Sequence, residues 1–160
     1  MTPIGWAAMA LLCVAVLWVF SSSLAGGLIW DDKDLILNDP RIRDLSGFGR
    51  IWTQPFAAED IRSIGIGYYR PLTTLTLMLN YAMGGSDPSV YHWTNVLLHL
   101  VCSIVVFFLV RAFMLKPWPC LIVALLFALH PSRTENVAWI CGRTDILAGL
   151  FLFLSFLLFV

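Results

Sequence analysis

The first thirty residues of this 160-residue chain contain no charged side chain. A helix needs roughly 20 apolar residues to cross the bilayer's hydrocarbon core of about 30 Å, and this run is longer. We therefore expect a membrane-spanning helix over residues 4–29. A cleaved secretory signal is the alternative, but such signals carry basic residues before an apolar stretch of only about 7–15 residues. No Lys or Arg precedes this run.

Charge is concentrated in blocks along the rest of the sequence. Twelve of the twenty charged residues lie between Asp31 and Arg62, and three later apolar stretches carry none. The chain is 59% apolar and 12% charged, whereas an ordinary soluble domain is about 45–50% apolar and about 25% charged. This pattern predicts an all-α integral membrane protein. The further spans that it predicts cover residues 90–115, 117–130 and 145–160, of which the second is short for a span.

The charged blocks are the predicted loops, at residues 31–88 and 130–145. Arg111 and Lys116 flank a short turn between two predicted spans, and the positive-inside rule places such a basic turn in the cytoplasm. The N-terminus is then cytoplasmic, and both charged loops face the opposite, external side. Ten basic and ten acidic residues leave no net charge, which argues against a nucleic-acid partner.

Two amphipathic stretches lie in the loop over residues 31–88. The first follows Asp44 and places Leu45, Phe48 and Ile51 at helical spacing. The second begins at Pro71, a residue well suited to the first position of a helix. About 13 residues cannot cross a bilayer, so we expect both helices to lie in the membrane interface. Ordinary loop helices packed on protein are the alternative. The apolar face of the second stretch consists of Leu72, Leu75, Leu79 and Ala82.

The predicted span over residues 90–115 carries a line of polar and sulfur-bearing side chains. Their spacing of three or four residues puts them on one face of the helix. Polar side chains in a membrane helix usually face the bundle interior or a wet cavity. For His99, a helix–helix hydrogen bond is as good an interpretation as a functional role. The four residues are His92, Asn95, His99 and Cys102.

On this topology, carboxylates, arginines and histidines gather at the external membrane face. Carboxylates act as general bases or metal ligands, and an arginine grips phosphate oxygens through its planar fork. Such a set suits a reaction on a lipid-linked phosphate. The structural alternative stays open, because Asp31 and Asp32 could cap a helix and Arg143 could pair with Asp145. The candidates from these loops are Asp31, Asp32, Arg70, His130, Arg133, Glu135, Arg143 and Asp145.

Five short motifs follow one another in a characteristic order. They are Trp30-Asp31-Asp32, Asn38-Asp39-Pro40, and the segments 69–72, 91–99 and 130–145, the last of which reads HPSRTENVAWICGRTD. In this order the motifs resemble the start of the transmembrane-and-tetratricopeptide-repeat proteins. Those proteins are membrane glycosyltransferases of the GT-C fold, related to the protein O-mannosyltransferases.

The resemblance implies a GT-C-like helical bundle fragment with interfacial helices in the first external loop. It implies transfer of a sugar from a polyprenyl-phosphate donor to an acceptor hydroxyl of a protein or glycan at the bilayer. The catalytic carboxylates would be Asp31, Asp32 and Glu135. Arg70, Arg133 and Arg143 would bind the donor phosphate, with His99, His130 and Asp145 in support. A divalent metal is compatible with these carboxylates, and no other cofactor is indicated.

The family continues with further spans and repeats that lie outside these 160 residues. We therefore expect residues 1–160 to form the N-terminal part of a polytopic membrane domain. The expected location is a bacterial inner membrane or, in a eukaryote, the endoplasmic reticulum membrane. The alternative function is that of a non-catalytic membrane protein, either a degenerate homologue or a lipid-binding assembly subunit.

Overall fold

The computed structural model describes residues 2–53, 69–113 and 116–160 of the chain. Every regular element within these ranges is helical. Among the described residues, three helical segments are long and apolar enough to cross a membrane: Pro3–Ala25, Pro88–Phe113 and Ile140–Phe159. The chain therefore has the all-α architecture of a membrane-embedded bundle, as its uncharged apolar runs predict.

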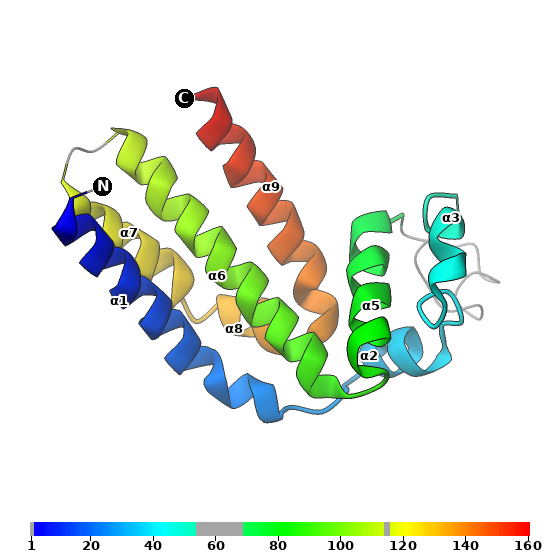
Figure 1. The fold of residues 1–160 in the computed structure, drawn as a ribbon. Helices are drawn as coiled ribbons and strands as arrows, with labels where there is room; N and C mark the ends of the chain where they lie inside the picture. Colours follow the sequence, from blue (N-terminus) through cyan, green and yellow to red (C-terminus); the bar gives the residue numbers. More distant parts are fainter. Residues whose placement is uncertain (1, 54–68, 114–115) are drawn as a thin grey trace.

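Four helices form the body of this bundle (Figure 1). The first, α1 (Pro3–Val19), continues into the 3₁₀ segment η1 (Phe20–Ala25). The long helix α6 (Pro88–Phe113) runs antiparallel to it, α7 (Pro117–Ala128) returns alongside α1, and α9 (Arg143–Phe159) packs along α6. The apolar core of the bundle joins α1, α6 and α7 through side chains such as Leu12, Phe107 and Ala124.

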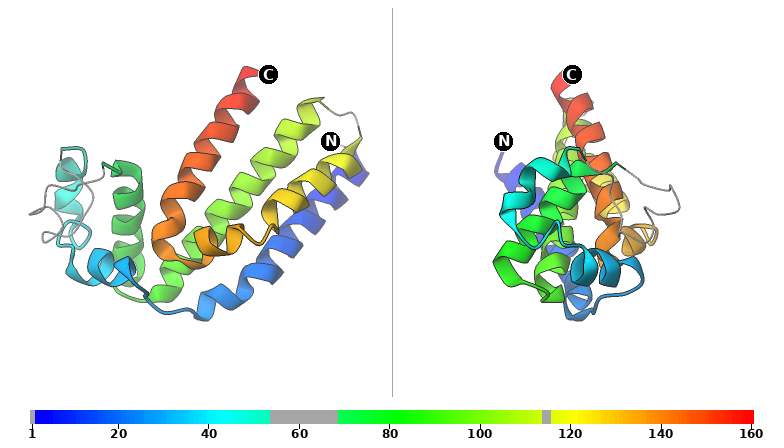
Figure 2. Two further views of the ribbon diagram at one scale, coloured as in Figure 1. Left: turned by 180° about the vertical axis from the view of Figure 1, so that it is seen from behind. Right: turned by 90° about the vertical axis from the view of Figure 1, so that its right-hand side faces the viewer.

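The helix α7 is shorter than its neighbours. Its 12 residues extend about 18 Å at 1.5 Å per residue, less than a hydrocarbon core of about 30 Å. The chain then turns at His130 and Pro131 into α8 (Arg133–Ala138) and the 3₁₀ segment η4 (Ile140–Gly142). Because α8 contacts both α6 and η1, this polar segment lies beside the long helices rather than beyond their ends (Figures 1 and 2).

The loop after α1 folds into short helices next to one end of the bundle. They are α2 (Asp31–Lys33), the π-helical turn η2 (Asp34–Asn38), η3 (Leu45–Gly47), α3 (Phe48–Ile51) and α5 (Pro71–Gly84). As predicted, helical structure follows Asp44, whose carboxylate accepts the backbone N–H of Ser46 at 2.9 Å. Hydrogen bonds from the hydroxyl and the backbone N–H of Ser46 hold the pKa of Asp44 below its ordinary value. The second predicted helix begins at Pro71, also as predicted.

The helix α5 packs on the protein through a mixed face and exposes apolar side chains on the other face. Thr73, Thr74 and Asn80 are buried together with the apolar Leu77 and Met78. On the outward face, Leu79 is 48% exposed and Met83 is 77% exposed. This outward apolar face is compatible with the predicted position of the helix in the membrane interface.

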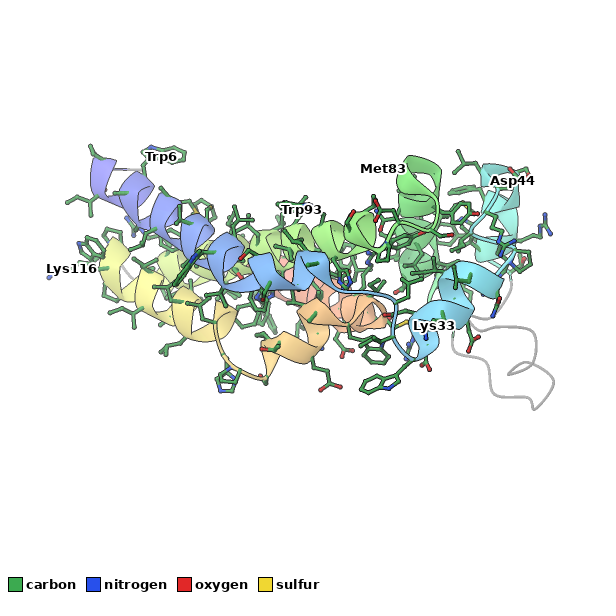
Figure 3. The ribbon with its side chains drawn as sticks, turned by 90° about the horizontal axis from the view of Figure 1, so that it is seen from below. Trp6, Lys33, Asp44, Met83, Trp93 and Lys116 are labelled. Carbon is green, nitrogen blue, oxygen red and sulfur yellow. The ribbon has the colours of Figure 1, made fainter. Side chains whose placement is uncertain are left out.

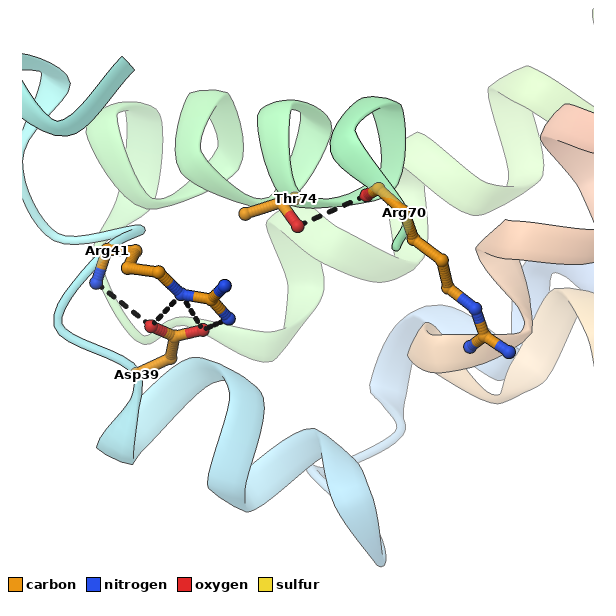
Figure 4. Close-up of polar contacts among 4 residues, drawn as sticks. All are labelled: Asp39, Arg41, Arg70 and Thr74. Carbon is orange, nitrogen blue, oxygen red and sulfur yellow. Dashed lines mark hydrogen bonds and ion pairs between the residues drawn. The ribbon is translucent and has the colours of Figure 1, made fainter. Parts of the chain in front are cut away.

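A buried ion pair stabilises the loop between η2 and η3. The carboxylate of Asp39 accepts the backbone N–H of Arg41 at 3.0 Å and its Nε–H at 2.8 and 2.9 Å. Both side chains are less than 5% exposed, and Figure 4 shows the guanidinium lying flat against the carboxylate. A buried pair of this kind is tolerated only when its hydrogen bonds are satisfied, and these bonds hold the loop in one conformation.

Candidate active site at the acidic end of the bundle

The candidate residues other than His99 lie at the end of the bundle formed by residues 26–53, 69–95 and 129–145, which we call the acidic end. His99 lies one turn of α6 further into the bundle. Figure 3 shows Lys33 and Asp44 at this end, far from Trp6 and Lys116. The N-terminus and the basic turn after α6 thus lie at the opposite end. This separation agrees with the predicted arrangement, in which both charged loops share one face.

The two neighbouring carboxylates of the acidic pair have different environments. Asp32 is completely buried, and its carboxylate accepts the backbone N–H of Cys141 at 3.0 Å and that of Ile29 at 3.3 Å. Asp31 is exposed. The bond to Cys141 joins residues 109 positions apart, so Asp32 ties the segment after α1 to η4. Asp31 is left with its carboxylate directed to the surroundings.

The polar face of α6 is buried, as its spacing predicts. His92, Asn95, His99 and Cys102 are each at most 2% exposed. The Nε2 atom of His99 lies 2.9 Å from the carbonyl oxygen of Ala128 at the end of α7. Since a carbonyl only accepts, Nε2 carries the proton of this helix–helix hydrogen bond. This contact agrees with the structural interpretation of His99.

Arg143 forms a buried network instead of facing a cavity. Its side chain is 0% exposed. Its Nε donates to Oδ1 of Asn95 and its Nη1 to Oδ1 of Asn80, each at 2.7 Å, and its Nη2 donates to the carbonyl of Tyr91 at 2.9 Å. The guanidinium thereby joins α9, α6 and α5, and its donors are directed at protein oxygens rather than toward a ligand.

Asn95 extends this network to the loop before α9. Its amide nitrogen donates to the carbonyl of Trp139 at 3.0 Å and lies 3.3 Å from that of Ile140. The loop thus held contains Cys141, whose N–H binds Asp32. A continuous set of hydrogen bonds therefore runs from α5 through Arg143 and Asn95 to the acidic pair.

A cavity of about 340 Å³ opens between α6, α7, α8 and α9. Its polar lining comes from Arg133, Asn136 and Asp145, while His99 and Cys102 are its fully buried members. The guanidinium of Arg133 lies over the Phe127 ring, 5.5 Å from its centroid. Asn136 donates to the Asp145 carboxylate at 2.7 Å, so Asp145 pairs with this amide and not with Arg143. The remaining lining residues, Phe127, Ile146, Gly149 and Phe153, are apolar.

Three other candidates lie around this end. Glu135 is exposed on α8, and exposed His130 contacts the Ser132 hydroxyl at 2.8 Å within its own turn. Arg70 is half-buried before α5, and it lines a smaller cavity of about 210 Å³ between α5 and α9. Figure 4 shows its side chain extending away from the Asp39–Arg41 pair. Within residues 2–53, 69–113 and 116–160, no three His, Cys, Asp or Glu side chains come together as a metal site.

The structure thus divides the predicted site residues into groups. Arg133 and Asp145 share the larger cavity with His99, Asp32 and Arg143 are buried in hydrogen-bonded positions, and Asp31 and Glu135 are exposed. Sequence reasoning missed the two amides that hold Arg143. Asn95 is an amide on the predicted polar face of an apolar helix, which is a signal that it has a partner, and Asn80 lies outside the predicted apolar face of Leu72, Leu75, Leu79 and Ala82.

Comparison with curated proteins gives matches along nearly the whole chain. Human protein O-mannosyl-transferase TMTC4 is 36% identical over 170 residues, which cover 97% of this chain. Human protein O-mannosyl-transferase TMTC1 is 35% identical over 98% of this chain, and Drosophila melanogaster Tmtc1 is 32% identical over 91%. The chain is a relative of the TMTC protein O-mannosyl-transferases.

The similarity covers a limited part of each TMTC protein. The chain spans 23%, 18% and 17% of the lengths of human TMTC4, human TMTC1 and Drosophila Tmtc1, respectively. No protein-family model and no solved structure matches the chain. The relationship agrees with the resemblance that the ordered motifs indicate.

Proposed function

We propose that this chain is part of a membrane glycosyltransferase that transfers mannose from a polyprenyl-phosphate donor to a protein hydroxyl. The curated relatives are named protein O-mannosyl-transferases and come from animals, which favours the endoplasmic reticulum membrane. The reaction would take place at the acidic end, on the external side, with the N-terminus in the cytoplasm. The donor, the orientation and the residue roles below belong to this proposal.

The observation that carries the proposal is the hydrogen bond from the Cys141 N–H to Asp32. This bond fixes the acidic pair against the segment that contains Arg133 and Glu135. A base for the acceptor and a cation for the donor phosphate are thereby held at one end of the bundle. Of the pair, Asp31 is the base because it is exposed, and Asp32 is a positioning residue because both its oxygens accept backbone N–H groups.

The proposed step is a displacement at the anomeric carbon of the sugar. Asp31 takes the proton of the acceptor hydroxyl, whose oxygen forms the new bond to that carbon. The bond between the carbon and the phosphate oxygen breaks, and the polyprenyl phosphate leaves with the electron pair. Arg133 stabilises the charge that grows on this phosphate, and preorganised groups of this kind supply a large part of catalysis.

The cavity lined by Arg133 supports this placement of the donor. It combines a polar rim of Arg133, Asn136 and Asp145 with an apolar interior that includes Phe127 and Phe153. Because the Asp145 carboxylate accepts a hydrogen bond from Asn136, Arg133 is the cation of this rim for a phosphate joined to a hydrocarbon chain. Arg70 is the second candidate for the phosphate, from the α5 side. Glu135 is the second catalytic carboxylate in this proposal. Arg143 acts as a positioning residue, since its guanidinium is fully buried.

The proposal is tested with Asp31→Asn and Asp32→Asn in the full-length protein. Asn cannot take a proton, and general base catalysis contributes about 10²–10⁴-fold. We therefore expect Asp31→Asn to lose that factor in kcat with unchanged thermal unfolding, and Asp32→Asn to lower the unfolding temperature. Asp34→Asn is the matched control, because Asp34 is an exposed neighbour whose carboxylate accepts a hydrogen bond from the nearby Asn38 amide at 3.0 Å.

Normal turnover by Asp31→Asn would remove Asp31 as the base. A wild-type protein that binds the mannosyl lipid but transfers nothing to any peptide would instead favour the alternative, a lipid-binding subunit without catalysis.

A further inference from the structure

Two tight turns in the structure share one unusual backbone conformation. In the turn Ile29–Asp32 the second residue, Trp30, has φ 47° and ψ −124°, and the Asp32 N–H donates to the Ile29 carbonyl at 2.9 Å. In the turn Gly84–Asp87 the second residue, Gly85, has φ 60° and ψ −126°, and the Asp87 N–H donates to the Gly84 carbonyl at 3.1 Å. Both match the type II′ turn, whose second position is normally Gly.

Trp30 therefore occupies a turn position that normally requires Gly. Among the described residues it alone combines a side chain with positive φ. For a bulky residue this conformation is a genuine outlier that costs conformational energy. Such strain concentrates at active sites and ligand clamps, where the surrounding structure enforces it. Here the strained residue immediately precedes Asp31.

The indole of Trp30 is presented to the surroundings beside a second indole. Trp30 is 72% exposed, and its ring meets that of Trp139 edge-to-face at 5.9 Å. The Nε1–H of Trp139 is buried and has no hydrogen-bond acceptor within the described ranges. Trp139 lies two residues before Cys141, which binds Asp32. The paired indoles therefore lie on the two segments that the hydrogen bond from Cys141 to Asp32 joins.

Anchoring in the bilayer interface does not account for this arrangement. Tryptophans are common at that interface, but other exposed tryptophans of this chain lie on ordinary helices and need no unusual backbone conformation. Trp6, Trp93 and Trp118 are 63%, 46% and 52% exposed from α1, α6 and α7. An anchoring role would therefore not explain why Trp30 occupies a strained turn.

We propose that Trp30 binds the pyranose ring of the donor, with Trp139 beside it. A pyranose has an apolar face of C–H groups, and the negative face of an indole attracts such groups. The exposed Trp30 ring would stack on this face and hold the anomeric carbon near Asp31. This inference rests on the proposed function, and it adds the residues that recognise the sugar.

The experiment measures lipid binding without turnover, in the full-length protein carrying Asp31→Asn and reconstituted in nanodiscs. Two probes are compared: polyprenyl-phosphate mannose and the same polyprenyl phosphate without sugar. Trp30→Gly should weaken binding of the mannosyl lipid about tenfold, a difference of about 1.4 kcal/mol, and leave binding of the bare lipid unchanged. Trp30→Phe should retain most of the affinity because it keeps an aromatic face. Trp93→Ala is the matched control and should change neither affinity.

Equal affinity of Trp30→Gly and its parent for the mannosyl lipid would overturn the inference, as would an equal loss for both lipids. If Asp31→Asn abolishes transfer while Trp30→Gly leaves both affinities unchanged, the proposed function stands and the sugar contact is wrong. If the wild type transfers no sugar but Trp30→Gly selectively loses the mannosyl lipid, the sugar contact stands and the catalytic proposal fails.

Discussion

Arg143 shows how burial limits what a charged side chain can do. An arginine within a membrane-spanning segment is costly unless it is paired, and this one is paired with amide and carbonyl oxygens instead of a carboxylate. From α9, its planar fork reaches partners on both α5 and α6, a geometry that lysine cannot reproduce. Arg133, only ten residues earlier, is half-buried and lines a cavity. The two arginines of one motif thus have different environments.

The first prediction separates these two arginines. Arg143→Lys should lower the thermal unfolding temperature of the full-length protein, because Nε, Nη1 and Nη2 bind partners in different directions. Hydrogen bonds to charged groups contribute about 1.5–3 kcal/mol each, so we expect a loss of about 2 kcal/mol or more. Arg133→Lys should leave unfolding unchanged and raise the donor KM. Normal stability of Arg143→Lys together with a raised donor KM would place Arg143 in the phosphate site instead.

At the scale of elements, the junction between α8 and α9 depends on Gly142. A Cβ at this position would lie 2.6 Å from the carbonyl oxygen and 2.8 Å from the Cα of Asn136. These are backbone atoms of α8, which cannot rotate away. The same junction carries Cys141, Arg143 and the carbonyl groups that bind Asn95. Close packing at one glycine therefore fixes the segment that holds the acidic pair.

The second prediction follows from this packing. Gly142→Ala should lower the free energy of unfolding by more than about 1 kcal/mol. Ala reduces the conformational entropy of the unfolded chain, but at a site with no room for its Cβ the destabilisation of the folded state is larger than this benefit. It should also reduce transfer, because η4 would shift under Asp32. Gly149→Ala is the matched control in the adjoining helix α9, where the added Cβ would meet Phe153 and Cys102 at ordinary contact distances of 3.9 and 4.0 Å. Equal unfolding temperatures for the two variants would contradict the prediction.

The sequence predicted the elements better than their contacts. The uncharged apolar runs locate the spans, because the length of an apolar run is a local property of the sequence. Pro71 locates the start of α5 for the same reason. The partners of Arg143 lie 48, 52 and 63 residues away, so no local pattern indicates them. The difference in burial between Asp31 and Asp32 is also set by a distant residue, since Asp32 accepts the N–H of Cys141. The helix α5 was predicted to be amphipathic, and only the packing shows that Thr73 and Asn80 are buried together with Leu77 and Met78.

The third prediction concerns the outward face of α5. If this helix lies in the membrane interface, a nitroxide attached at Leu79→Cys should be more accessible to oxygen, which partitions into lipid, than to a water-soluble nickel complex. Asp87→Cys, exposed just beyond the helix, provides the aqueous reference and should show the opposite preference. Greater accessibility of Leu79→Cys to the nickel complex would make α5 a loop helix away from the lipid.

For the whole molecule, the arrangement of the two ends decides whether the proposed site can work. The acidic end carries the candidate carboxylates and arginines, and the opposite end carries the N-terminus and the basic turn (Figure 3). Three segments able to cross a membrane connect the two ends. An acceptor and a donor sugar must therefore both be on the side of the acidic end, and the function depends on which side that is.

The last prediction tests this orientation. Arg111 and Lys116 form the short basic turn, which the positive-inside rule assigns to the cytoplasm. In a background without the native cysteines, a membrane-impermeant thiol reagent applied to the external side should label Lys33→Cys and leave Lys116→Cys unlabelled. Both positions are exposed, so burial within the protein would not explain a difference in labelling. Ser63, which is also in the predicted external loop, lies outside the described residues. Labelling after detergent permeabilisation should reach both positions. Labelling of Lys116→Cys alone in intact membranes would invert the topology and put the carboxylates on the cytoplasmic side, where the proposed external reaction has no site.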